Sequence, residues 1–226
     1  MLSKQMWNFV ILITILIISP WSWQIFSSNL LLLVLIWALS IVLLFTVINP
    51  SNKLKIVCGI LFTILIIWQC ITTKNTSLSY INPTEEYLLN ARRVRMSSIS
   101  FNIAGLKINP NLGKYLQSRQ AFMIYKFQEN LFRSLDINEY FFAGHPRERE
   151  GIREFEKFNF ILFPLFLLGI YMTIIKRRNY LLIGLISMYL VLGIIGTNNY
   201  LGAFILYPFF AIFITLGVMK IFKNNE

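Results

Sequence analysis

Residues 134–153, S-L-D-I-N-E-Y-F-F-A-G-H-P-R-E-R-E-G-I-R, close the one long polar segment of this sequence and lead straight into a hydrophobic run. The stretch contains the single histidine, His145, together with the densest cluster of charged residues in the chain. On both sides of the polar segment the sequence is strongly apolar. The fold therefore depends on how two sets of apolar runs hold this segment between them.

The composition is that of a membrane protein. Of the 226 residues, 56% are hydrophobic and only 14% are charged, which lies outside the range of soluble globular domains. Six apolar runs are long enough to cross a bilayer. They are Trp7–Phe26, Leu30–Ile48, Ile56–Thr72, Phe158–Ile175, Tyr180–Thr197 and Leu201–Phe222. No small-residue cleavage site follows the first run, so we expect a retained membrane helix rather than a signal peptide.

The runs predict an all-α polytopic membrane protein with six transmembrane helices. Three helices lie in residues 1–72, a mainly helical inserted segment occupies 73–157, and three more helices lie in 158–226. Away from their ends, the runs contain no Asp, Glu, Lys, Arg or His. Because pumps and coupled transporters usually place an ionisable group at membrane depth, this absence argues against those classes.

The charges of the short connections predict the orientation. Basic residues gather at both termini and in two connections: Lys4, Lys53, Lys55, Lys176, Arg177, Arg178, Lys220 and Lys223. The connections at 27–29 and 198–200 carry no charge. By the positive-inside rule, both termini are cytoplasmic and residues 73–157 are extracytoplasmic. The net charge of +11 is then mostly an orientation signal, so we expect no nucleic-acid partner.

Prolines and glycines within the runs suggest ordinary helix packing. We expect Pro164 and Pro208 to kink the fourth and sixth spans, in preference to forming the discontinuous helices of a transporter. Five glycines are expected to let helices pack closely: Gly169, Gly184, Gly193, Gly196 and Gly217.

The first part of the polar segment predicts a helix over Asn82–Met96. Asn82 is a good N-cap, Pro83 suits the first helical position, and Glu85 follows three residues after the cap. The helix ends in a cluster of cations, Arg92, Arg93 and Arg95. One interpretation is that these cations complement the helix dipole while solvated. The other is that they bind a phosphate or a lipid headgroup beside the membrane.

The rest of the polar segment predicts a loop and a second helix. Ser97–Gly113 contains Gly105, Pro110 and Gly113, which favour a loop with a short extended piece. Tyr115–Leu135 has helical spacing, and we expect it to pack on the spans or to lie at the membrane interface. Its apolar face consists of Ala121, Ile124, Tyr125, Gln128, Leu131, Phe132 and Leu135.

Residues 144–146, Gly-His-Pro, predict a turn that presents His145, Arg147 and Arg149 beside the membrane. These residues either bind an anion or belong to a solvated charged connector, and the residues alone leave both interpretations open. We expect no metal site, because no acid or histidine here has a known ligand spacing and the cysteines, Cys58 and Cys70, form no such spacing either. No cofactor is expected.

Several segments together resemble the C-terminal part of GT-C membrane glycosyltransferases, of the protein O-mannosyltransferase and aminoarabinose transferase type. The resemblance rests on E-Y-L-L-N-A-R-R (86–93), the helix that follows, L-D-I-N-E-Y-F-F-A-G-H-P-R (135–147) and L-G-A-F-I-L-Y-P-F-F-A-I-F-I-T-L-G (201–217). It covers residues 80–222 and implies a partner lipid of the polyprenyl-phosphate-sugar class.

The departures from that family leave catalysis open. The resemblance implies an acidic residue in the first outer loop, but here that loop is W-S-W-Q-I-F-S-S-N (21–29), and no catalytic residue is identified. The first interpretation is a protein that is not catalytic alone and binds a lipid phosphate or a partner membrane subunit. The second is a self-sufficient glycosyltransferase that uses outer-segment acids such as Asp136 or Glu139. The third is a membrane assembly protein without a ligand.

Overall fold

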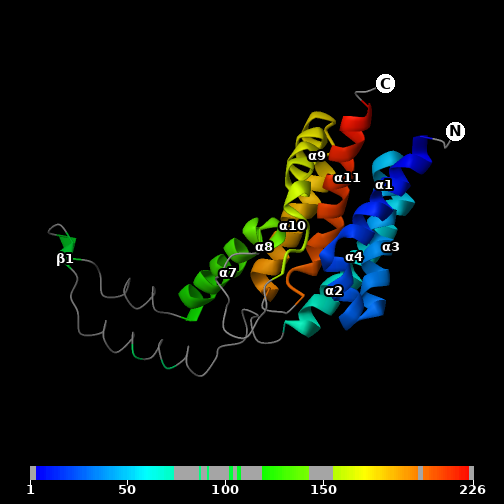
Figure 1. Ribbon diagram of the computed structural model, residues 1–226. Coiled ribbons are helices and arrows are strands. Elements are labelled where there is room, and N and C mark those ends of the chain that lie inside the picture. Colours follow the sequence, from blue (N-terminus) through cyan, green and yellow to red (C-terminus); the bar gives the residue numbers. More distant parts are fainter. Residues whose placement is uncertain are drawn as a thin grey trace.

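The structure, a computed structural model, describes residues 4–73, 87, 91, 102–103, 106–107, 119–142, 155–197 and 201–223. These parts of the chain form an upright bundle of helices with two further helices at one end (Figure 1). The helices are α1 Lys4–Ile18, α2 Pro20–Ser28, α3 Leu30–Ile48, α4 Asn52–Thr72, α7 Arg119–Leu135, α8 Asn138–Phe141, α9 Phe163–Ile175, α10 Asn179–Ile195 and α11 Tyr207–Lys223. Short 3-10 turns, η1 Phe160–Leu162 and η2 Phe204–Leu206, precede α9 and α11.

Three helices are long and apolar enough to cross a membrane. They are α3, α4 and the helix that runs from η2 into α11, Phe204–Phe222. The bent pair of α1 and α2 makes a fourth if it is counted as one span, while Phe160–Ile175 and α10 are shorter apolar helices. The prediction of an integral, helical membrane protein is therefore confirmed at this level.

The first part of the polar segment, residues 74–118, contributes few described residues. Tyr87 and Ala91, inside the predicted helix 82–96, are both helical. Strands β1 (Asn102–Ile103) and β2 (Leu106–Lys107) pair in an antiparallel hairpin. This hairpin is the short extended piece that the sequence predicts within the loop 97–113.

Three prolines lie at helix beginnings. The first apolar run is divided at Ser19 into α1 and α2, which are bent by 65°, and Pro20 is the first residue of α2. Pro164 and Pro208 are the second residues of α9 and α11, where each helix follows a 3-10 turn. A proline in the first turn sacrifices no helical hydrogen bond. The predicted kinks within the fourth and sixth spans are therefore wrong, and the prolines begin helices instead.

The core of the bundle surrounds α11. Residues 201–217 are all buried, and α11 contacts α9, α1 and α3. A Cβ atom added at Gly169 would collide with the backbone carbonyl of Phe213, and one at Gly217 would collide with that of Leu165. α9 and α11 therefore pack backbone to backbone, as the sequence predicts for these glycines.

The bundle sorts its connections by charge. The N-terminus of α1, the α3–α4 and α9–α10 connections and the C-terminus of α11 share one end, here called the basic end (Figure 1). There the Tyr180 hydroxyl donates to the Thr46 carbonyl at 3.3 Å. The opposite, neutral end contains α2, α7, α8 and the α10–α11 connection, and there Trp21 Nε1 donates to the Leu201 carbonyl at 2.8 Å. The α2–α3 connection and the described ends of the α10–α11 connection thus lie at the end of the bundle where the long polar segment is inserted.

Candidate functional site

The predicted lipid-phosphate residues lie outside the described part of the chain. These residues are His145, Arg147, Arg149, Arg92, Arg93 and Arg95. The described chain stops at Phe142 and resumes at Phe155, on either side of the residues for which a Gly-His-Pro turn is predicted. The Phe142 ring contacts the Phe163 ring edge to face at the start of α9, with ring centroids 5.4 Å apart. The connection that carries His145 therefore leaves from the neutral end of the bundle.

A buried lysine, Lys157, is the main polar feature of this end. Its exposed fraction is 6%. Lys157 is the last residue of the charged connector, for which one interpretation of the sequence predicts a solvated surface. Lys157 Nζ lies 3.6 Å from Glu139 Oε2. The same nitrogen lies 4.8 Å from the ring centroid of Tyr140 and 5.5 Å from that of Trp21. The ammonium is thus held by one carboxylate and two aromatic faces. We call Trp21, Glu139, Tyr140, Lys157 and Gly202 the Lys157 junction.

The backbone of Lys157 binds α2. Its carbonyl accepts hydrogen bonds from Ser19 Oγ at 2.8 Å and from the backbone N–H of Trp21 at 3.2 Å. Ser19 is the residue at which α1 bends into α2, and Pro20 cannot donate a backbone hydrogen bond. The lysine carbonyl therefore supplies the acceptor that fixes the bend.

Helix α8 is tied to the same junction. The backbone N–H of Phe158 donates to the Tyr140 carbonyl at 2.8 Å, and the Tyr140 hydroxyl donates to the Ser134 carbonyl at 2.8 Å. Burial raises the pKa of the Tyr140 phenol well above its ordinary value, so the phenol stays protonated and remains a donor. Tyr140 thus joins the end of α7 to the start of η1.

The connection before α11 closes the junction. Gln69 Nε2 of α4 donates to the Gly202 carbonyl at 3.2 Å. Gly202 has φ +69°, and a Cβ atom there would lie 2.8 Å from both Cε and Nζ of Lys157. Only glycine fits both this backbone conformation and this contact. The junction therefore joins segments from both halves of the sequence.

The two acids offered as catalytic candidates have structural partners. Glu139 is paired with Lys157, and Asp136 Oδ1 accepts a hydrogen bond from the backbone N–H of Asn138 at 3.0 Å, at the start of α8. Within the described ranges, no three His, Cys, Asp or Glu residues are grouped as metal ligands. The Lys157 junction therefore holds four chain segments in place around one buried ion pair. These segments are α2, α8, the chain that leads into η1, and the α10–α11 connection.

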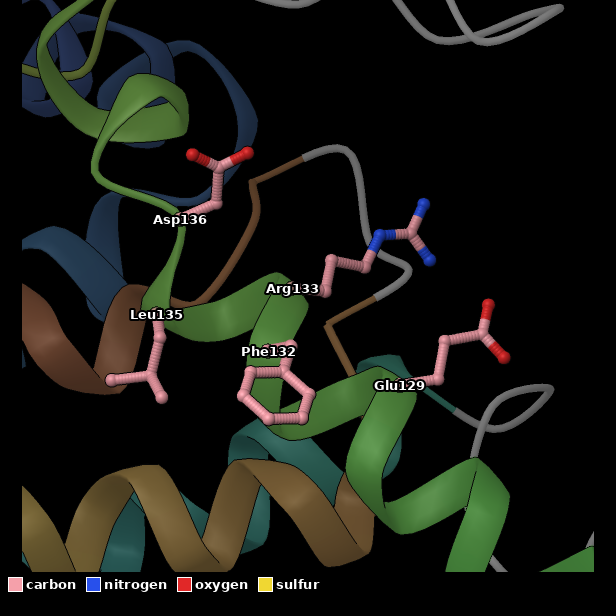
Figure 2. Close-up of a pocket in the computed structure, with 5 residues that line it drawn as sticks. All are labelled: Glu129, Phe132, Arg133, Leu135 and Asp136. Atoms are coloured by element: carbon pink, nitrogen blue, oxygen red, sulfur yellow. The ribbon is translucent and has the colours of Figure 1, made fainter.

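An open hollow lies at the C-terminal part of α7. Its volume is about 540 Å³, and it is lined by Glu129, Phe132, Arg133, Leu135 and Asp136. Figure 2 shows the three charged side chains pointing away from the two apolar ones. The hollow thus lies along the boundary between a polar and an apolar surface of the helix.

Sequence reasoning missed Lys157, Trp21 and Gln69. The available signal for Lys157 is its position directly before an apolar run, where a charge has to be solvated or paired. Its partner Glu139 is separated from it by the Gly-His-Pro connection, so no helical spacing links the two residues. Only the return of the chain to the neutral end brings them together.

Comparison of the chain with models of known protein families, with curated proteins and with solved structures finds no match.

Proposed function

We propose that six apolar segments of this protein cross the bilayer, with α1 and α2 counted as one, and that both termini are cytoplasmic. The basic ends of α1 and α11 and the two short basic connections all lie at one end of the bundle, which supports this topology. Phe160–Ile175 is about 24 Å long at 1.5 Å per residue, which is less than a typical hydrocarbon core. Local thinning of the bilayer or interfacial flanking residues accommodate such a difference.

The orientation is tested by labelling a cysteine introduced at Ser100 in a variant that lacks both native cysteines. We expect a membrane-impermeant maleimide to label this residue only from the extracytoplasmic side, because the positive-inside rule predicts that residues 73–157 are extracytoplasmic. A cysteine introduced at Arg177, in the α9–α10 connection, is the matched control and should be labelled only from the cytoplasmic side. The opposite pattern for either residue would refute the orientation.

For the activity, we propose a membrane component that binds a lipid phosphate at the neutral end and is not catalytic alone. The pairing of Glu139 with Lys157 carries the proposal, because it commits this largely buried acid, one of the two catalytic candidates, to a structural ion pair. The resemblance to GT-C glycosyltransferases suggests a polyprenyl-phosphate sugar as the lipid and a partner membrane subunit as the source of catalytic groups. The six predicted residues, from Arg92 to Arg149, would bind the phosphate.

Two other functions predict different outcomes. A self-sufficient glycosyltransferase would have to use Asp136, whose side chain is exposed at the hollow on α7. A membrane assembly protein would bind no lipid phosphate at all. Arg forms bidentate hydrogen bonds to phosphate that Lys cannot reproduce, which distinguishes a shaped phosphate site from a surface of positive charge.

Binding is tested with purified protein in nanodiscs and a short polyprenyl phosphate, measured by native mass spectrometry. We expect the combined change of Arg92, Arg93, Arg147 and Arg149 to Ala to weaken binding by about tenfold or more, since charge-assisted hydrogen bonds contribute about 1.5–3 kcal/mol each. Arg147→Lys alone should also weaken it. The control removes four charges at the basic end: Lys53, Lys55, Lys220 and Lys223 to Ala.

Equal binding by the arginine variant and the control would overturn the lipid-phosphate site.

A separate assay follows sugar transfer from a polyprenyl-phosphate sugar by the protein without any partner. We expect no turnover. Turnover that Asp136→Asn abolishes would identify a self-sufficient enzyme.

A further inference from the structure

Helix α7 turns its most apolar face away from the protein. Ile124, Tyr125, Phe132 and Leu135 are exposed, and we call these four residues the α7 stripe. Tyr125 and Phe132 have exposed fractions of 65% and 68%. The sequence predicts this face as the one that packs on the spans or meets the membrane. The described structure shows that it does not pack on the spans.

The opposite side of α7 packs against the bundle and fixes the rotation of the helix. Lys126, Asn130 and Ser134 are buried on that side. Asn130 Nδ2 donates to the carbonyl of Gly193 in α10 at 3.3 Å. A Cβ atom at Gly193 would lie 2.5 Å from the ring of Phe127, so α7 and α10 are in close contact here. The stripe cannot turn inward without breaking these contacts.

The helix that carries the stripe packs against α10, and the exposed side of α10 faces lipid under the proposed topology. α10 carries an exposed apolar row along its length, formed by Ile183, Ile186, Leu190 and Ile194. The last member of this row, Ile194, follows the glycine on which α7 packs. Exposed apolar residues spaced by three and four positions form one continuous side of a helix. Because α7 contacts α10 at Gly193, one residue before the end of this row, lipid is favoured over water or a second copy as the occupant of the stripe.

The hollow on α7 brings charged side chains to the border of the stripe. Phe132 and Leu135 belong to the stripe, whereas Glu129, Arg133 and Asp136 point away from it (Figure 2). One guanidinium between two carboxylates complements a group that carries both a phosphate and an ammonium. Guanidinium groups bind phosphate in a bidentate manner, and carboxylates accept hydrogen bonds from ammonium.

We propose that α7 lies in the headgroup layer of the bilayer, with the stripe on the acyl chains and a zwitterionic phospholipid headgroup in the hollow. Arg133 faces the phosphate, and Glu129 and Asp136 face the ammonium. This arrangement rests on the proposed membrane topology, but it is independent of the polyprenyl-phosphate site, which uses other residues. Amphipathic helices at an interface bury their apolar face a short distance below the headgroups.

Depth is measured by nitroxide labelling of the full chain in vesicles, in a background without Cys58 and Cys70. Labels are placed at Phe132 on the stripe, at Glu129 on the polar side, and at Ile186 on α10 as the marker of membrane embedding. We expect oxygen to relax the labels at Phe132 and Ile186 more than a water-soluble nickel complex does. The label at Glu129 should show the reverse.

The three labels separate the two proposals. A label at Ile186 that meets water would overturn the membrane topology and the α7 proposal together. A label at Ile186 in lipid with one at Phe132 in water would overturn the α7 proposal alone. Dipolar broadening of the Phe132 label that grows with the protein-to-lipid ratio would identify a second copy of the chain as the occupant and would also overturn it.

Headgroup choice is measured by native mass spectrometry of lipid retained from nanodiscs with equal phosphatidylethanolamine and phosphatidylglycerol. The double variant Glu129→Gln, Asp136→Asn changes the formal charge of the hollow from −1 to +1 and keeps the acceptor that begins α8. We expect the retained ratio to shift at least about threefold toward the anionic lipid. Glu156→Gln is the control and should leave the ratio unchanged. An unchanged ratio in the double variant would overturn the headgroup assignment.

Discussion

Replacing Lys157 by methionine is expected to lower the free energy of unfolding by about 3 kcal/mol or more. Methionine keeps an apolar stem against Trp21 and Tyr140 but leaves the largely buried Glu139 carboxylate without its cation. Removing one partner of a buried ion pair costs about 3–5 kcal/mol, because the remaining charge stays desolvated. The measurement is thermal and denaturant unfolding of the purified protein in detergent, followed by tryptophan fluorescence.

A double-mutant cycle distinguishes the ion pair from simple loss of packing. Glu139→Gln alone should also destabilise, whereas Lys157→Met with Glu139→Gln should recover much of the loss, because no buried charge remains. Lys53→Met, on an exposed lysine at the basic end, serves as the control and should change stability little. Additive losses in the double variant would show that the pair contributes no coupling and that the Lys157 junction is held by its aromatic contacts and hydrogen bonds.

Replacing Gly169 or Gly217 by alanine is the second change with a large expected effect. The new methyl group would overlap a backbone carbonyl of the facing helix, at Phe213 or Leu165 respectively, and a backbone group cannot rotate away as a side chain can. α9 must then move from α11 along their whole contact. We expect a loss of about 3 kcal/mol or more for each variant, at the upper end of overpacking costs.

A third glycine, Gly59, serves as the control for these two variants. Gly59 lies within α4 with no atom within 4 Å of an added Cβ, so Gly59→Ala should be neutral or stabilising by up to about 1 kcal/mol. The double variant at 169 and 217 should lose less than the sum of the single losses, because one displacement of α9 relieves both overlaps. Gly169→Ala with a melting temperature equal to that of Gly59→Ala would contradict the close approach of α9 and α11.

The basic end and the neutral end of the bundle have different roles. The basic end carries the loop charge that favours one orientation in the membrane. The neutral end joins α2, α8, η1 and the α10–α11 connection through the Lys157 junction, directly beside the segment that carries the predicted lipid-phosphate residues. A rigid junction at that position would hold the entry and exit of the segment at a constant separation, which is what a shaped phosphate site requires.

Much of the helical structure could be predicted from the sequence because the signals are local. α3 and α4 follow from unbroken apolar runs. The structure adds the capping contacts at their beginnings: Asn29 Oδ1 accepts from the Leu32 N–H at 3.1 Å, and Ser51 Oγ accepts from the Leu54 N–H at 3.2 Å, so that α4 begins at Asn52, before the apolar run at Ile56. The glycines of α9 and α11 were also recognised, because small residues in apolar helices mark close contacts. The candidate phosphate residues follow from local charge patterns, and they stay a prediction.

What the sequence alone determined is which segments are helical, which are apolar enough for a membrane and where the basic charge lies. Only the tertiary structure decided that α7 faces outward with its apolar stripe and that Lys157 is buried. In a soluble protein the apolar face of a helix identifies the face that packs, but lipid is as apolar as a protein core, so amphipathicity cannot distinguish the two in a membrane protein. Lys157 is buried because Trp21 of α2 and the neighbouring residues Glu139 and Tyr140 of α8 converge on it from two separate parts of the chain. Such convergence depends on contacts distant in sequence, which no local pattern records.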